Sequence, residues 1–275
     1  MRGRHAIARR RQTPSVQLLR TTKGPAGNGE PLLSLVSAGG GRSPRVPRRD
    51  TPLYGRSVLY VKPSDLTAVE AVLSTPRIST YVAAAGGDLG RALELYAWNA
   101  HISASLMLPA HFAEVAVRNV VDEALSDVYG PRWPWDGAFE RSLPKPSRWS
   151  RERKILIDAR DHPTTGKVVA DLKFVFWEKM FTARHDIRVW DQRILMLFPH
   201  APGGMTAREL RGRVARDLEA IRRLRNRLAH HEPIFSRDIE LDLKMMLDLV
   251  DLRSAQTGEW VRTMEQVTTL LAAKP

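Results

Sequence analysis

Apolar residues recur at three- and four-residue spacing along most of the chain from Ser64 onward, which is the pattern of amphipathic helices. The clearest case lies between Thr206 and His231, where one aliphatic stripe comprises Leu210, Val214, Leu218, Ile221, Leu224 and Leu228. Pro233 cannot continue a helix and biases Glu232 away from helical angles. We therefore expect this helix to end at or just before the two adjacent histidines, with one face in the core.

Shorter periodic segments predict further helices on both sides of this one. Ser64 or Asp65 can cap a helix through Leu73, and Asp88 can cap a long helix that should end near Pro109. The other expected helices run through Phe112 to Leu125, from about Ser147 to Ala159, from Val168 to Phe181, from Ser236 or Asp238 through Val250, and from Trp260 to Leu271. Because no alternating strand pattern or internal repeat occurs, the predicted fold is all-α, a helical bundle of one domain.

Residues 1–57 are expected to form a disordered basic extension, which leaves 58–275 as the helical domain. The first fifty residues hold eleven Lys and Arg against only Glu30 and Asp50, whereas the other 225 hold 32 basic and 28 acidic residues. Glycine- and proline-rich stretches interrupt the basic clusters and no apolar period is sustained. The extension fits an organellar transit peptide, an arm that binds RNA phosphates, or an upstream extension from a misassigned start codon.

Composition excludes several classes of protein. Apolar residues make up 43% of the chain, which is enough to build a core. The absence of cysteine excludes disulfides and thiolate metal sites and fits a reducing, cytoplasmic compartment. No apolar run approaches the roughly 18–20 residues of a membrane-spanning helix, so we expect a soluble protein with no membrane partner. The net charge of +13 suggests a polyanionic partner, but its concentration near the N-terminus means that a nucleic-acid function must rest on a site.

The helix that precedes Pro233 ends in a group of residues suited to chemistry. Arg225, Asn226, His230 and His231 stand beside the expected turn. On an ideal helix Asn226 and His230 lie one turn apart on the same face, whereas Arg225 lies about 140° around from His230. Arg225 and His230 must therefore converge across a groove, which a second copy of the helix around a two-fold axis could complete.

Two plainer interpretations of this group remain open. Cationic and amide side chains in the last turn also suit the negative end of a helix dipole and can bond its free carbonyls. Two histidines followed by Glu232 could suggest a metal, but the spacing matches no zinc-binding helix and neighbouring side chains point in different directions. We therefore expect neither a metal nor another cofactor.

Three blocks of the sequence resemble one family in the order in which that family has them. Arg225-Asn226, three residues and then His230 resemble the R-N-x-x-x-H signature of the HEPN superfamily, and HEPI at 231–234 extends it as in Abi-like (abortive infection) proteins. LYAWN at 95–99 with EVAVRN at 114–119 resembles the first helices of the family, and 166–181 resembles its later aromatic segment. The likeness covers roughly residues 66–271.

The resemblance implies a HEPN-like bundle, a homodimer whose two signatures face one cleft, and metal-independent cleavage of RNA by an endoribonuclease of abortive-infection or toxin type. His230 would then act as general acid or base, Arg225 would bind phosphate, and Asn226 would orient the phosphate or the imidazole. Attack by the ribose 2′-oxygen would leave a 2′,3′-cyclic phosphate, a reaction for which DNA lacks the nucleophile.

Residues around the signature have supporting roles in this hypothesis. Three residues could extend the RNA-binding surface, although such charge is more often merely solvated: Arg222, Arg227 and His231. Glu114 and Arg118, at i and i+4, predict a helix ion pair and could support the cleft together with Asn119. Four aromatic residues are most simply core, although they could stack on a base: Trp98, Phe174, Phe176 and Trp177.

The main alternative is a catalytically silent HEPN domain that binds RNA or mediates dimerisation. The intact Arg225, Asn226 and His230 favour the enzyme. A third alternative, an antitoxin-like partner, is disfavoured because the family supplies toxins. The resemblance instead implies that a separately encoded antitoxin protein could neutralise this chain.

Overall fold

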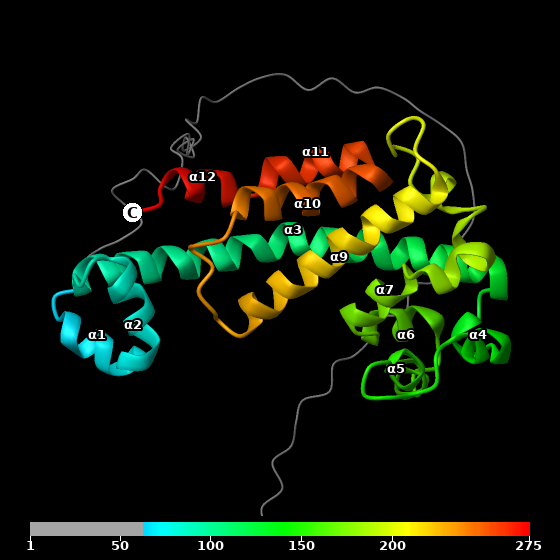
Figure 1. Cartoon of the computed structure of the whole chain (residues 1–275), viewed down its shortest axis with the longest axis horizontal. Coiled ribbons are helices and arrows are strands. Elements are labelled where there is room, and N and C mark those ends of the chain that lie inside the picture. The colour runs from blue at the N-terminus through cyan, green and yellow to red at the C-terminus, as the bar shows by residue number, and fades with distance from the viewer. Residues whose placement is uncertain (1–62) are drawn as a thin grey trace, which may run out of the picture. The chain divides into compact units, whose positions relative to one another are not determined.

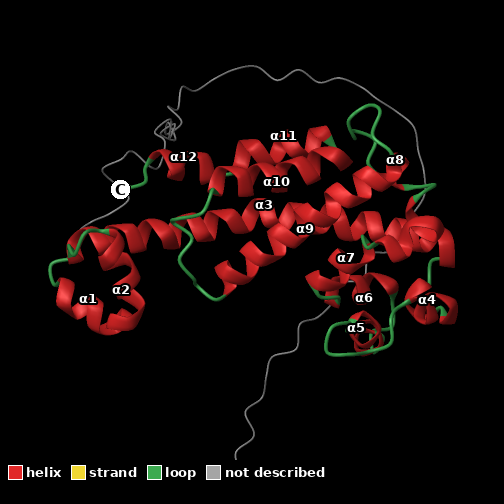
Figure 2. Cartoon of the chain, in the orientation of Figure 1, coloured by secondary structure: helices red, strands yellow, loops and turns green. Residues whose placement is uncertain are grey.

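The computed structural model describes residues 63–275, and every regular element in that range is a helix or a helical turn (Figure 2). The all-α prediction is therefore confirmed, and the described residues form one compact unit. No helix among them is long and apolar enough to cross a membrane. The basic extension expected at 1–57 lies outside the described residues.

The longest helix, α3 (Leu89–Tyr129), corrects the prediction of a helix end near Pro109. Asp88 caps α3 as expected, accepting a hydrogen bond of 3.0 Å from the Arg91 N–H. The helix continues through Pro109, which is buried together with Leu106 and Ala110. Packing of the turns on both sides of the proline offsets the backbone hydrogen bond that it cannot donate.

Two short helices pack near the start of α3. Asp65 caps α1 (Leu66–Leu73), as predicted, by accepting a hydrogen bond of 3.0 Å from the Ala68 N–H. The next helix, α2 (Thr75–Ala84), contacts α3, and its Ile78 and Tyr81 are buried. Figure 1 shows both helices gathered at one end of α3.

Short elements occupy the stretch after α3. They are α4 (Gly137–Ser142), α5 (Glu152–Ala159), α6 (Thr165–Asp171), α7 (Phe174–Met180), α8 (Ile194–Leu197), and turns at Trp133–Trp135, Ala183–His185 and Asp186–Trp190. The helix predicted from Ser147 begins only at Glu152. The helix predicted from Val168 to Phe181 is divided because Leu172 and Lys173 are extended, with ψ of 128° and 148°. This break lets apolar residues of both α6 and α7 reach the core.

The C-terminal part contains α9 (Ala207–Ala229), α10 (Ile239–Arg253), α11 (Ala255–Met264) and α12 (Val267–Ala272). All six residues of the predicted α9 stripe are buried, and the helix ends where expected. Asp238 caps α10. The predicted last helix is two helices, because Glu265 is extended with ψ of 149° and accepts a hydrogen bond of 3.1 Å from the Thr268 N–H.

The core is formed around α3, which contacts α2, α7, α9, α10 and α12. All four aromatic residues expected in the core are buried: Trp98, Phe174, Phe176 and Trp177. Trp98 also donates its indole N–H to the Leu270 carbonyl at 2.7 Å, which ties α12 to α3. These side chains therefore stabilise the bundle and are not available to stack on a base.

A buried histidine makes the stability of the fold depend on pH. Burial of His185, together with the charge of Arg184, lowers its pKa to about 4. Between about pH 6.5 and pH 4 the unfolded chain therefore binds a proton that the folded chain does not. Each unit of falling pH in this window should cost up to about 1.4 kcal/mol of stability.

In the variant His185→Gln, residue 185 cannot bind a proton in the unfolded chain. The variant should therefore lose less stability than the wild type when the pH falls from 7 to 5. Urea denaturation at both pH values measures the difference, because carboxylates contribute equally to the two proteins. Parallel pH profiles would show that His185 does not limit the acid stability of the fold.

Candidate functional site

The residues of the signature lie where α9 ends and the chain turns toward α10. His230 terminates the helix, and its backbone N–H donates to the Asn226 carbonyl at 2.9 Å. Asn226 and His230 are both exposed, and within residues 63–275 neither side chain has a hydrogen-bond or ion-pair partner. Their polar atoms are therefore open to a ligand.

The turn after His230 has a fixed backbone. The His231 and Glu232 N–H groups donate to the Leu228 and Arg227 carbonyls at 3.1 and 2.8 Å, which is the Schellman pattern of helix termination. His231 has φ of 55°, in the left-handed region where glycine is usual. An imidazole at this position is thus held in an uncommon conformation.

Two distant residues hold this turn against the bundle. Arg77 of α2 donates a hydrogen bond of 3.1 Å to the His231 carbonyl. Asn99 of α3 is buried, and its amide oxygen accepts a hydrogen bond of 2.8 Å from the Ile234 N–H. The sequence did not predict either contact, although Asn99 ends the LYAWN block, because both contacts join segments far apart in the chain.

Arg225 faces the bundle rather than the turn. Its Nε lies 3.3 Å from Glu114 Oε2 on α3, and its guanidinium carbon lies 6.0 Å from the centre of the Phe174 ring. Glu114 Oε1 is also 3.7 Å from Arg118 Nη2, which confirms the predicted ion pair. One carboxylate therefore serves two guanidinium groups, and the cluster keeps a net positive charge. The remaining predicted supporting residue, Asn119, is exposed on α3.

Two residues predicted to bind RNA already have protein partners. Arg222 pairs with Glu178 of α7, a buried carboxylate that also lies 3.3 Å from Lys179 Nζ. Arg227 donates to the Pro233 carbonyl at 3.1 Å, and its Nε is 3.4 Å from the Glu232 carboxylate. Each arginine therefore stabilises the fold or the turn, whatever further contact it makes.

Replacing Arg222 tests its structural role. The variant Arg222→Ala leaves Glu178 buried with Lys179 as its remaining cation, so we expect a loss of about 1–3 kcal/mol in the free energy of unfolding. Adding Glu178→Gln should recover most of this loss, because it removes the buried charge. Urea denaturation of the single and double variants measures both effects. Unchanged stability of Arg222→Ala would refute the structural role.

A hollow of about 680 Å³ opens beside the turn, between α2, α3 and the end of α9. Its polar lining includes Arg77, Tyr96, Ser103 and His231. The third predicted RNA-binding residue, His231, thus borders this hollow, whereas Arg225 contacts α7. In a single chain, His231 and Arg225 therefore lie on different sides of α9.

Comparisons with known proteins give no relative from which a function could be transferred: no family model matches the chain, and no curated protein or solved structure matches it either. Within residues 63–275 no three His, Asp or Glu side chains are grouped as a metal site. The function must therefore be inferred from the chain's own residues.

Proposed function

We propose that this protein is a metal-independent endoribonuclease of the HEPN type, which acts in the cytoplasm as a toxin or phage-defence protein of abortive-infection type. The observation that carries the proposal is the end of α9. There Asn226 and His230 are exposed on a fixed turn, with no partner among residues 63–275, and the positively charged cluster around Arg225 lies on a different face of the same helix. The end of α9 thus provides an imidazole that can exchange a proton near neutral pH and a guanidinium that can bind phosphate.

The chemistry assigned to these residues is a transfer within the RNA strand. His230 removes the proton of a ribose 2′-hydroxyl, and the 2′-oxygen attacks the adjacent phosphorus. The bond from phosphorus to the 5′-oxygen breaks, and that oxygen receives a proton from an imidazolium. Arg225 offsets the charge that develops on the phosphate, and Asn226 orients it. The products are a 2′,3′-cyclic phosphate and a 5′-hydroxyl.

A homodimer would complete this site. In one chain Arg225 contacts Glu114 and Phe174, whereas His230 points into solvent about 140° around the helix axis. A second copy related by a two-fold axis would place an Arg225 opposite each His230. A separate antitoxin protein that covers this cleft is the neutralising partner that a toxin of this type would need.

Cleavage of RNA in excess EDTA tests the proposal. The wild type should cut single-stranded RNA to cyclic-phosphate ends and should leave a substrate with 2′-deoxyribose at the scissile position intact. The variant Arg225→Ala should lose about 10²–10³-fold in rate, the contribution of a group that stabilises developing charge. Arg216→Ala, which removes an exposed arginine of the same helix, is the matched control and should cut normally.

The ion pair of Arg225 with Glu114 favours one second candidate, a silent domain that binds RNA or dimerises, because a purely structural arginine would make the same contact. Folded wild-type protein that binds many RNAs but cuts none of them would establish this alternative and refute the enzyme.

A further inference from the structure

Glu152, the first residue of α5, is a buried carboxylate to which residues 63–275 offer no partner. Only 8% of the residue is exposed, and its Oε2 is buried with no hydrogen-bond partner. Within residues 63–275 the carboxylate also forms no ion pair, although arginines and lysines lie nearby. Burying an unpaired carboxylate is unfavourable, so its retention here points to a ligand that donates hydrogen bonds.

The surroundings of Glu152 form a site with an aromatic surface. Glu152 lines two adjoining hollows of about 420 and 150 Å³, which share Trp149 and Lys179. Trp149 is 78% exposed, and the Arg148 guanidinium lies 4.4 Å from its ring centre. An exposed tryptophan beside arginine is the arrangement on which bases of single-stranded nucleic acids stack.

The charges around this hollow select the ligand further. Four cationic residues line it or its rim: Arg148, Arg151, Lys179 and Arg184. The neighbouring carboxylate of Glu178 is already paired with Arg222 and Lys179. A metal cation or a basic peptide would be repelled by this rim, so the ligand must present donors toward Glu152 and negative charge toward the arginines and the lysine.

We propose that this hollow binds a guanine nucleotide of single-stranded RNA. Guanine carries two adjacent donors, N1–H and the N2 amine, which are suited to a carboxylate acceptor such as Glu152. Its ring stacks on Trp149, and its phosphates lie against Arg151, Lys179 and Arg184. The inference deepens the proposed ribonuclease function, on which it rests, by naming one base that the enzyme holds.

His185 at the wall of the hollow fits the same ligand. Burial lowers the pKa of His185 to about 4, so its imidazole is neutral near pH 7 and offers one N–H donor. The acceptors O6 and N7 of guanine lie on the edge next to N1, where such a donor can be used. Adenine has an amine at that edge and lacks the paired donors, so the site should disfavour it.

The hollow is connected to the candidate catalytic turn by a row of charged residues. Lys179 of the hollow lies 3.3 Å from Glu178, which in turn pairs with Arg222 of α9. Arg222 is one helical turn from Asn226. A strand whose guanine occupies the hollow can therefore follow the α7–α9 surface toward His230.

Fluorescence anisotropy of labelled single-stranded oligonucleotides measures binding to the His230→Ala variant. This variant lacks the proposed catalytic imidazole, so the measurement does not depend on cleavage. An oligonucleotide with one guanine in a uridine run should bind about tenfold more tightly than its adenine or inosine counterpart, since inosine lacks the N2 amine. Glu152→Gln should remove this preference while keeping the volume of the side chain. Trp149→Ala should weaken all the oligonucleotides on the order of tenfold.

Matched controls separate these effects from general damage. Glu240→Gln and Trp260→Ala alter exposed residues of the same types on α10 and α11, and both should bind as the parent does. Circular dichroism checks that each variant is folded. GMP should compete only at far higher concentration than the oligonucleotide.

Equal binding of the guanine and adenine oligonucleotides, or a guanine preference that survives Glu152→Gln, would overturn the assignment. If GMP competed as strongly as the oligonucleotide, the hollow would bind a free guanine nucleotide, and the assignment to RNA would be wrong. Cleavage by wild-type protein in EDTA is scored separately, so failure of this site and failure of the ribonuclease proposal are distinguishable.

Discussion

Replacing His230 with asparagine should lower the rate of RNA cleavage by about 10²–10⁴-fold, which is the contribution of a positioned general acid or base. His230 carries this expectation because its imidazole is exposed, lacks a partner within the described residues, and follows Asn226 by one helical turn. Single-turnover rates on a defined oligonucleotide in EDTA, measured over a range of pH, report the chemical step directly.

The adjacent histidine supplies the matched control for this experiment. His231→Asn should lower the rate far less than His230→Asn does, because His231 borders the α2–α3 hollow and is not assigned the proton transfer. Asparagine tolerates the left-handed φ of 55° at this position, so the substitution preserves the turn. If His231→Asn were inactive and His230→Asn active, the catalytic imidazole would be the one beside the hollow, and the assignment by motif spacing would be wrong.

Local signals explain why the frame of the site could be predicted from the sequence. The aliphatic stripe of α9 specifies its buried face, and Pro233 limits where the helix can end. Both signals act within a few residues, so no knowledge of the tertiary structure is needed. The position of Asn226 and His230 at an exposed helix end follows from them.

The backbone of the turn could not be predicted in the same way. The left-handed residue of a Schellman termination is usually glycine, which can be recognised in a sequence, but here it is His231. Its conformation is maintained by Arg77 and Asn99, which are more than a hundred residues away in sequence. A single sequence contains no signal that joins these residues to the turn.

Helix periodicity predicts the face of the helix on which a side chain lies, but not the residues that it contacts. The angle of Arg225 around α9 correctly separates it from His230, yet nothing in the spacing identifies Glu114 or Phe174 as its contacts. Pro109 is a second case in which a local pattern does not predict the tertiary structure. The local rule that proline ends a helix is overridden because burial of the neighbouring turns is worth more than the lost hydrogen bond.

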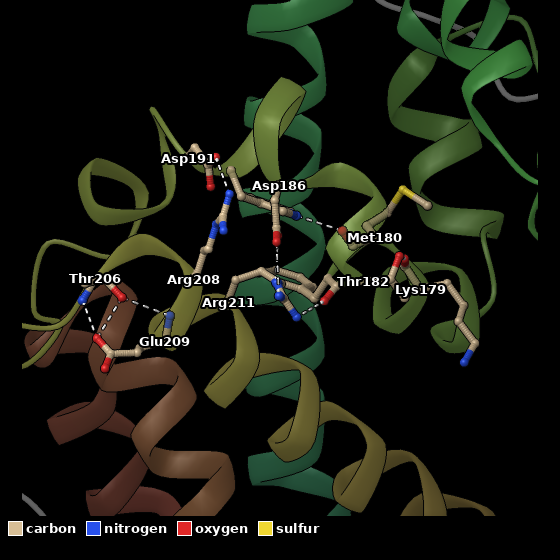
Figure 3. A network of polar contacts seen from close by, with 11 residues as sticks. Lys179, Met180, Thr182, Asp186, Asp191, Thr206, Arg208, Glu209 and Arg211 are labelled. Atoms are coloured by element: carbon tan, nitrogen blue, oxygen red, sulfur yellow. Dashed lines mark hydrogen bonds and ion pairs between the residues drawn. The ribbon is translucent and has the colours of Figure 1, made fainter.

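Arg211→Ala should destabilise the fold by about 3–5 kcal/mol, because it leaves a buried carboxylate without its cation. Arg211 Nε and Nη2 donate to the two Asp186 oxygens at 2.8 and 3.2 Å, and Nη1 donates to the Phe181 carbonyl at 3.4 Å (Figure 3). The side chains of Arg211 and Asp186 are only 17% and 10% exposed, so water cannot easily replace these bonds. Urea denaturation measures the loss.

A neighbouring pair on the same surface provides the comparison for Arg211. Arg208 lies 3.8 Å from Asp191, but its side chain is 68% exposed, so Arg208→Ala should cost less than about 1 kcal/mol (Figure 3). The double variant Arg211→Met, Asp186→Leu should recover most of the stability lost in Arg211→Ala, because it removes the uncompensated charge and fills the same space. Recovery would assign the loss to the buried charge of Asp186, whereas a double variant as unstable as Arg211→Ala would assign it to the bond with the Phe181 carbonyl and to packing.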